Sequence, residues 1–138
     1  MIKTRRIQIN KGSYRTNFGW LASLEKILRH KYKINKNISL ALVSPARMQE
    51  LNRVYRGYNK VTDVLSFYME SDLILGEVII CLSQAKKQAR ERRANFGSEL
   101  KLLTVHGILH LLGYDHEKNA VEAGRQSRQE KMILSLLK

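Results

Sequence analysis

The chain has 138 residues, 43% of them apolar, which predicts one folded domain over residues 1–138 and argues against a disordered chain. No apolar stretch approaches the ~20 residues of a membrane span, residues 1–20 show no secretory signal, and a single cysteine, Cys81, excludes an intramolecular disulfide and a cysteine-rich zinc site. A net charge of +13, from 25 Lys and Arg against 12 Asp and Glu, is typical of proteins that bind polyanions. We therefore expect a cytoplasmic protein that does not associate with membranes.

Apolar periodicity and capping residues predict the elements of the chain. In chain order they are a strand at 5–9, a helix at 17–31, a strand at 38–43, a helix at 45–55, strands at 64–68 and 73–82, and helices at 83–94, 99–112 and 120–137. The strands at 64–68 and 73–82 are expected to form an antiparallel pair. Because strands and helices do not alternate regularly, this order predicts an α+β fold with one small mixed sheet packed against several helices.

Individual residues indicate where several of these elements begin or bend. Thr16 or Asn17 is expected to cap the helix at 17–31, and Ser44 to cap the next helix, whose first position is a proline. Ser83 is the expected cap of the helix that follows the strand pair. Gly76 is expected to mark a bulge or a turn in its strand.

The positive charge is concentrated in the first part of the chain. Residues 1–60 contain 14 basic and 2 acidic residues, a net +12, whereas residues 61–138 contain 11 basic and 10 acidic residues, a net +1. The alternative is a charge that serves only solubility, but a single basic half favours a surface for nucleic acid.

Three histidines lie close together in and after the predicted helix at 99–112. That helix is apolar on nearly every side, so we expect it to be buried in the centre of the domain. His106 and His110 are four residues apart and share one side of it, where two imidazoles can reach one Zn²⁺. Gly113 ends the helix and lets His116 supply a third imidazole. Three protein ligands with an open fourth position are typical of a catalytic zinc site.

The alternative interpretation is that these histidines are core residues satisfied by hydrogen bonds. Burial of two imidazoles without strong partners costs several kcal/mol in total, and the spacing therefore favours one metal ion. The spacing is also that of the metzincin proteases. Gly107, however, stands where those enzymes have the glutamate that deprotonates the attacking water. The pattern predicts the geometry of a metzincin zinc site without its proteolytic machinery.

The run from His106 to His116, His-Gly-Ile-Leu-His-Leu-Leu-Gly-Tyr-Asp-His, resembles the signature of the YbeY family of endoribonucleases and rRNA maturation factors. Further blocks agree at residues 51–57, 62–67 and 75–80. The chain departs from the family pattern at Tyr68, where the family usually has proline, and at Glu77, where it more often has aspartate. It also departs at residues 124–126, where the family often has a methionine in an acidic stretch.

The resemblance implies an α+β fold, one Zn²⁺ held by His106, His110 and His116, and cleavage of single-stranded RNA. It implies Arg56 as the functionally important, catalytic arginine. It also implies processing of the 3′ end of 16S rRNA, ribosome biogenesis and ribosome quality control in the cytoplasm. The expected partners are single-stranded RNA or rRNA and the small ribosomal subunit or its proteins, and DNA is not expected.

Several residues take hypothetical roles in this reaction. Zinc would activate the nucleophile and bind the scissile phosphate, while the permanently charged guanidinium of Arg56 would stabilise the phosphoryl oxygens. Alternatively, Arg56 only positions the phosphate or is structural. Asp63 and Asp115 are candidates to hold the ligating histidines, or are simply turn residues.

Aromatic and basic residues outside the histidine motif are candidates for RNA contact. Tyr58 and Tyr14 are suited to stacking on unpaired bases, as is Tyr55, although its helical spacing from Leu51 favours a place in the core. The basic residues expected to face RNA are Lys26, Arg29, Lys31, Lys33, Lys36, Arg47, Arg53 and Lys60.

Two other functions compete with a zinc-dependent endoribonuclease. The first is a non-catalytic, ribosome-associated assembly factor in which zinc is only structural, and the positive charge serves both interpretations equally. The open coordination position of a three-ligand site favours the enzyme. The second is a metalloprotease, against which Gly107 argues.

Overall fold

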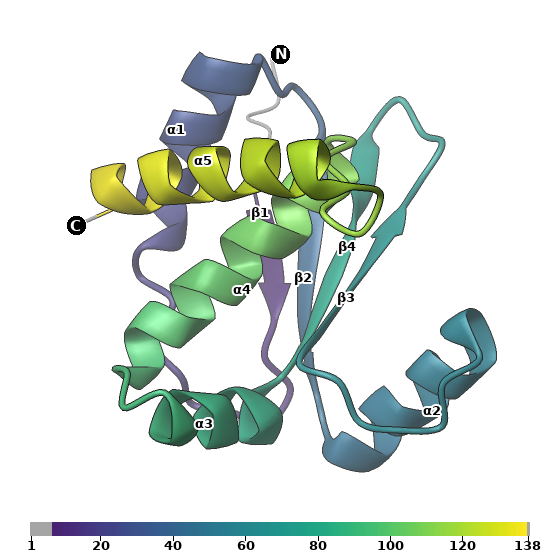
Figure 1. Cartoon of the computed structure of the whole chain (residues 1–138). Helices are drawn as coiled ribbons and strands as arrows, with labels where there is room; N and C mark the ends of the chain where they lie inside the picture. Colours follow the sequence, from purple (N-terminus) through teal and green to yellow (C-terminus); the bar gives the residue numbers. More distant parts are fainter. Residues whose placement is uncertain (1–6, 138) are drawn as a thin grey trace.

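A computed structural model describes residues 7–137, so the first part of the predicted strand at 5–9 lies outside the described residues. The elements in chain order are β1 (Ile7–Asn10), α1 (Leu21–Tyr32), β2 (Asn37–Val43), α2 (Pro45–Arg56), β3 (Val64–Tyr68), β4 (Ile74–Cys81), α3 (Leu82–Glu91), α4 (Phe96–Leu111) and α5 (Ala120–Leu136). This arrangement confirms the predicted α+β class (Figure 1). No helix within residues 7–137 is long and apolar enough to cross a membrane.

The four strands form one mixed sheet in the order β1-β2-β4-β3. The strands β1, β2 and β4 are parallel. The strand β3 runs antiparallel to β4, which confirms the antiparallel pair predicted at 64–68 and 73–82. The register between β2 and β4 shifts where Asn37 pairs with Ile74 but Ile38 pairs with Gly76. A β-carbon on Gly76 would lie 2.4 Å from the carbonyl oxygen of Phe67, so this irregular, crowded position excludes a side chain.

Helices cover the two faces of the sheet unequally. The helix α2 lies on one face, and α1, α3, α4 and α5 lie on the other (Figure 1). The larger core cluster joins the sheet to these four helices, whereas a smaller cluster around Met48 and Leu51 joins it to α2. Helix α4 is buried along most of its length and packs against α3, α5, β3 and β4, which confirms the predicted central helix.

The predicted start is correct for α2 but wrong for α1. The hydroxyl of Ser44 accepts a hydrogen bond from the backbone N–H of Arg47 at 3.2 Å, which is the predicted cap of α2. The start predicted for α1 is wrong, because the side chain of Asn17 accepts from the backbone N–H of Gly19 at 2.8 Å. This bond stabilises a turn in place of the first helical turn, and the helix begins only at Leu21.

Two later helices begin earlier than predicted. Helix α3 follows β4 directly, with Cys81 at its cap position, so Ser83 lies inside the first turn and does not cap it. Helix α4 starts at Phe96 because the side chain of Asn95 accepts from the backbone N–H of Ser98 at 3.2 Å. The asparagine that was expected to lie between two helices is therefore the cap of the second one.

Candidate active site

The candidate site is a pocket at the open edge of β3. Because β3 is the last strand of the sheet, side chains from α2 on one face and from α4 on the other meet around its free edge. The pocket has a volume of about 330 Å³. Its lining residues are Tyr55, Arg56, Val64, Leu65, Ser66, Phe67, His106, His110, Asp115, His116 and Glu117. All three predicted ligands and the predicted arginine thus line the same pocket.

The histidines reach the pocket from two segments, as the sequence spacing predicted. His106 and His110 lie on successive turns of α4, and His116 lies in the loop that follows Gly113, whose φ of +100° suits glycine. The rings of His106 and His116 lie edge to face with their centroids 4.6 Å apart. In the arrangement described, no three His, Cys, Asp or Glu side chains of residues 7–137 are gathered closely enough to hold a metal ion as they stand.

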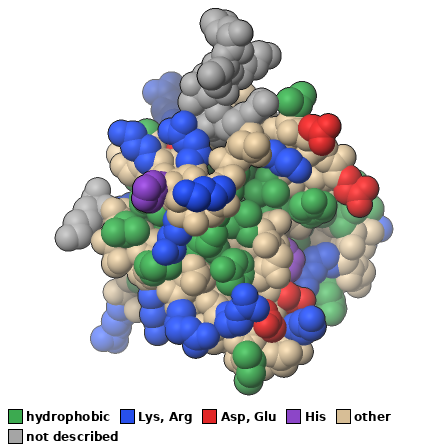
Figure 2. Space-filling model, turned by 90° about the horizontal axis from the view of Figure 1, so that it is seen from above, with side chains coloured by type: hydrophobic (Ala, Val, Ile, Leu, Met, Phe, Trp, Pro, Cys, Tyr) green, Lys and Arg blue, Asp and Glu red, His purple; other side chains and the backbone are tan. Residues whose placement is uncertain are grey.

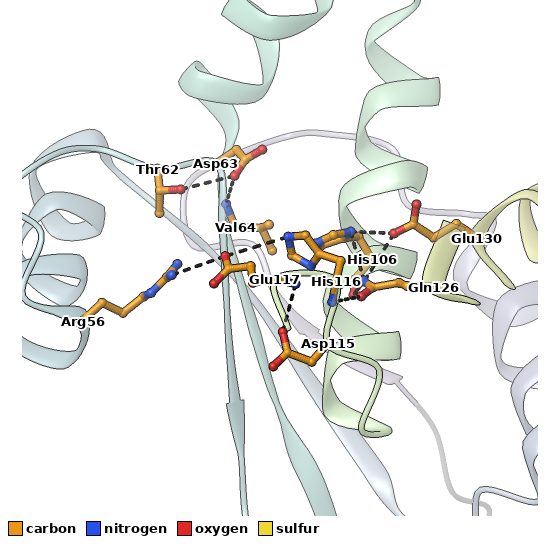
Figure 3. A network of polar contacts seen from close by, with 10 residues as sticks. All are labelled: Arg56, Thr62, Asp63, Val64, His106, Asp115, His116, Glu117, Gln126 and Glu130. Carbon is orange, nitrogen blue, oxygen red and sulfur yellow. Dashed lines mark hydrogen bonds and ion pairs between the residues drawn. The ribbon is translucent and has the colours of Figure 1, made fainter. Parts of the chain in front are cut away.

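Two residues of α5 hold His106 and His116 from behind (Figure 3). The Nδ1 atom of His106 lies 2.5 Å from a carboxylate oxygen of Glu130 and 3.2 Å from the amide nitrogen of Gln126. The side-chain oxygen of Gln126 accepts a hydrogen bond from the backbone N–H of His116 at 3.0 Å. Sequence reasoning missed both residues. The only available signal was that the four-residue spacing puts Gln126 and Glu130 on one side of a helix next to the histidine motif.

The donor chemistry of this site fits a zinc ion. Neutral imidazoles are preferred zinc ligands, and carboxylates commonly orient the rings of metal-binding histidines. Glu130 lies against Nδ1 of His106 in a position suited to that task. With Nδ1 of His106 occupied by Glu130, the Nε2 atom is the nitrogen left for a metal. In addition, Nδ1 of His116 is buried without a hydrogen-bond partner among the described residues. An unsatisfied buried nitrogen is costly unless a ligand pairs with it.

Arg56 reaches the pocket from the last turn of α2, opposite the histidines (Figure 3). Its Nη2 atom lies 3.6 Å from a carboxylate oxygen of Glu117, and the same oxygen lies 3.8 Å from Nε2 of His116. The guanidinium also lies over the ring of Tyr58, 5.5 Å from its centroid. Glu117 and Tyr58 therefore hold the arginine beside the histidines, and sequence reasoning gave Glu117 no role.

The close contact between α4 and the sheet explains the glycine at position 107. The hydroxyl of Ser66 donates to the carbonyl oxygen of Gly107 at 2.9 Å. A β-carbon at this position would lie only 2.7 Å from Cγ1 of Val78 and 3.0 Å from the Ser66 hydroxyl. The glutamate of a metzincin motif therefore has no room here, which supplies a steric reason for the missing general base.

The two aspartates considered as supports for the histidines bond elsewhere. Asp63 accepts from the backbone N–H of Val64 at 2.8 Å and from the side chain of Gln88 at 2.9 Å, and it does not line the pocket. Asp115 lines the pocket, but its described hydrogen bond is with the backbone N–H of Glu117, at 3.1 Å. In the described residues these bonds fix the start of β3 and the turn after α4.

The expectation that Tyr55 is a core residue is wrong. Met48, Leu51 and Asn52 form the buried side of α2, whereas Tyr55 is 65% exposed. Its ring contacts Phe67 on the edge strand, and within residues 7–137 no further strand lies beyond β3 to cover it. Tyr14, also considered for stacking, packs instead against the larger core cluster.

Five of the eight residues of the predicted basic surface form two separate groups. Lys26, Arg29 and Lys31 lie on α1. The face seen in Figure 2 carries Lys and Arg side chains around an apolar area. Arg53 and Lys60 accompany α2 and the loop after it, on the opposite face of the sheet (Figure 1). Neither group lines the pocket, but Lys60 lies over the same ring, that of Tyr58, as Arg56 does.

Comparison with known proteins identifies the family. The chain matches the family described as Endoribonuclease YbeY over residues 2–138. A protein of that name from Persephonella marina is 46% identical over 107 residues, which cover 73% of this chain and 70% of the relative. Another from Staphylococcus carnosus is 40% identical over 133 residues and covers 86% of each chain. The chain belongs to the YbeY family. It is accordingly an endoribonuclease, a hydrolase whose substrate is RNA, as the resemblance implied.

A solved structure agrees with this assignment at the level of the fold. The solution structure of TM1509 from Thermotoga maritima superposes with a TM-score of 0.67 at 31% sequence identity. The match covers 95% of this chain and 88% of the other. The fold that surrounds the pocket is thus shared with a relative over nearly the whole length of this chain.

Proposed function

We propose that the pocket at the edge of β3 is the RNA-cleaving centre of this endoribonuclease, and that it holds one Zn²⁺ through His106, His110 and His116. The observation that carries this proposal is the meeting of three imidazoles with the guanidinium of Arg56 in one pocket. The unpaired, buried Nδ1 atom of His116 supports a ligand at this place. The cleaved strand is single-stranded RNA.

Different side chains of the pocket take different roles in the proposed reaction. A bound zinc ion would supply Lewis-acid activation of water and of a phosphoryl oxygen. Nδ1 of His106 donates to the carboxylate of Glu130, which holds the ring in one orientation and leaves its second ring nitrogen for the pocket. Arg56 binds the oxygens of the scissile phosphate, for which its planar, permanently charged fork is suited, and stabilises their charge as the bond breaks. Glu117 holds the arginine in place before the phosphate replaces it as the arginine's partner.

The biological substrate follows from the same proposal. The resemblance to rRNA maturation factors supports cleavage at the 3′ end of 16S rRNA, in ribosome biogenesis and quality control in the cytoplasm. The net charge of +13 supports contact with rRNA and the small ribosomal subunit, because a strongly basic protein is attracted to a polyanionic particle.

Cleavage of a labelled single-stranded RNA tests the centre. We expect the wild type to cleave, His110→Ala to be inactive, and His30→Ala, which alters an exposed histidine on α1, to cleave like the wild type. All three proteins are purified identically, which excludes a contaminating nuclease. Equal cleavage by the wild type and His110→Ala, or none by either across several metals, contradicts the proposal and favours the assembly factor with a structural zinc.

Arg56→Lys tests the role of the arginine. Lysine keeps the charge but loses the planar fork, so we expect cleavage to fall about 10²-fold or more while affinity for the RNA is retained. Single-turnover cleavage and RNA affinity are measured on the same protein. Equal loss of affinity and cleavage would show that Arg56 only binds the substrate.

A further inference from the structure

Tyr55 presents a large aromatic ring to solvent at the mouth of the pocket. It is 65% exposed although it lies on the last turn of a helix packed against the sheet. Its ring rests edge to face on Phe67 of β3, with centroids 5.2 Å apart. This contact supports the ring from one side and leaves most of its surface accessible, which is unusual for a residue that could pack against apolar neighbours.

Two cationic residues, Arg56 and Lys60, follow Tyr55 closely in the sequence. The guanidinium of Arg56 and the ammonium of Lys60 lie over the ring of Tyr58, 5.5 and 5.7 Å from its centroid. Those contacts engage the ring of Tyr58 with the chain's own cations, whereas Tyr55 has only its edge contact with Phe67 among the described ring contacts. A free aromatic face beside phosphate-binding cations is how proteins hold unpaired nucleotides.

We infer that Tyr55 forms a base-binding subsite, on which an unpaired nucleobase next to the cleaved phosphate stacks. The inference rests on the proposed function, because it places the cleaved strand in the same pocket. Tyr55 and Arg56 are adjacent in sequence and both line that pocket, so the base and the phosphate of one short stretch of strand are held by neighbouring residues.

The subsite accounts for selection of single strands without selection of sequence. Every nucleobase offers an aromatic face, so stacking tolerates any base. A base within a duplex is already stacked on its neighbours and cannot offer that face unless it leaves the helix. A protein partner is the other candidate for an exposed aromatic patch, but Arg56, which lines the same pocket as Tyr55, favours a polyanion.

Substitution of Tyr55 tests the subsite on the full-length protein with a labelled single-stranded RNA. We expect Tyr55→Ala to raise the KM and the dissociation constant about 5- to 150-fold, which corresponds to about 1–3 kcal/mol for one stacked base. Tyr55→Phe and Tyr55→Trp keep a ring and should retain affinity. Tyr68→Ala is the matched control, because Tyr68 is 61% exposed on β3 but does not line the pocket.

An RNA with a single abasic nucleotide separates stacking from other effects. When the missing base is the one at the subsite, the wild type should bind as weakly as Tyr55→Ala binds intact RNA, and Tyr55→Ala should lose nothing further. If Tyr55→Ala weakens intact RNA and every abasic RNA by the same factor, the ring shapes the pocket and the inference is wrong.

The two proposals fail in different ways. If Tyr55→Ala binds RNA as tightly as the wild type, while the wild type and His110→Ala differ in cleavage, only the subsite is overturned. A protein partner is then the favoured ligand of the exposed ring. Equal cleavage by the wild type and His110→Ala overturns the proposed centre, whatever the affinity of Tyr55→Ala.

Discussion

The side chain of Gln126 connects two histidines that the sequence separates by a helix end and a loop. Its oxygen accepts from the backbone N–H of His116 at 3.0 Å, and its nitrogen lies 3.2 Å from Nδ1 of His106. Gln126 is 1% exposed, so water cannot replace these contacts without a rearrangement of α5. The amide therefore fixes the loop after α4 relative to the helix itself.

Replacement of Gln126 by methionine should weaken metal binding more than it weakens the fold. Methionine preserves much of the side-chain volume but removes both the acceptor and the donor, so the loop that carries His116 is released. We expect zinc affinity to fall about 10- to 100-fold, measured by competition with a chromophoric chelator.

A neighbouring glutamine provides the control for this substitution. Gln129 lies on the same helix but accepts a hydrogen bond from the hydroxyl of Tyr32, away from the histidines. Gln129→Met should keep the zinc affinity of the wild type. Equal zinc affinity in Gln126→Met and the wild type would show that the amide has no part in holding the ligands.

Gly107→Ala should destabilise the protein. The added carbon would approach Cγ1 of Val78 on β4 to 2.7 Å and the hydroxyl of Ser66 on β3 to 3.0 Å, and α4 packs against both strands. We expect a loss of about 1–3 kcal/mol in the free energy of unfolding, measured by chemical denaturation of the metal-free protein.

Gly124→Ala is the matched control, since this glycine also lies within a helix. Its β-carbon would meet only the flexible end of Arg128, at 3.3 Å, which can move aside. Alanine favours the helix over glycine, so the control should gain about 0.5–1 kcal/mol. If both substitutions changed stability alike, helix propensity rather than the contact with Val78 would decide the effect at position 107.

The features of the site that depend on residue spacing along the chain could be predicted from the sequence. His106 and His110 share a side of α4 because of helical periodicity, and Gly113 allows His116 to return, so all three could be placed before the structure. Gln126 and Glu130 could not be placed, because their contact with the histidines depends on how α5 is rotated and translated against α4. Periodicity within one helix does not determine either quantity.

The exposure of Tyr55 also depends on the tertiary arrangement, which helical periodicity does not determine. Its spacing from Leu51 correctly places it near the buried side of α2, but the extent of the sheet beneath that side decides whether it is covered. The strand order puts β3 at the edge, and that order follows from long-range pairing that the sequence pattern did not determine. The residue is exposed because the sheet ends there.

The two basic groups should contribute unequally to RNA binding. Reversal of charge in Arg53→Glu with Lys60→Glu, two residues close to Arg56 in the sequence, should weaken single-stranded RNA binding and lower the salt dependence by about one unit per lost phosphate contact. The same change at Lys26 and Lys31 on α1 should have a smaller effect. Affinity is measured across a range of salt concentrations. Equal effects of the two pairs would indicate that the RNA also follows the face of α1.

Tyr32 makes the stability of the fold sensitive to alkaline pH. Burial, with a further contribution from the charge of Tyr114, raises the pKa of Tyr32 from 10.0 to about 12. Its hydroxyl donates to the side chain of Gln129 and so connects α1 to α5, a bond that Tyr32→Phe removes. At pH 8 we expect this variant to be less stable by about 0.5–1.5 kcal/mol.

That difference should shrink as the pH rises from 10 to 12. In this range the unfolded chain loses the phenolic proton before the folded protein does, so the unfolded state of the wild type is favoured with increasing pH. Tyr32→Phe has no proton to lose at this position and does not share this part of the decline. Chemical denaturation of both proteins at pH 8, 10 and 11 measures the effect. A difference that stays constant across these pH values would mean that the phenol of Tyr32 ionises equally readily in the folded and unfolded states.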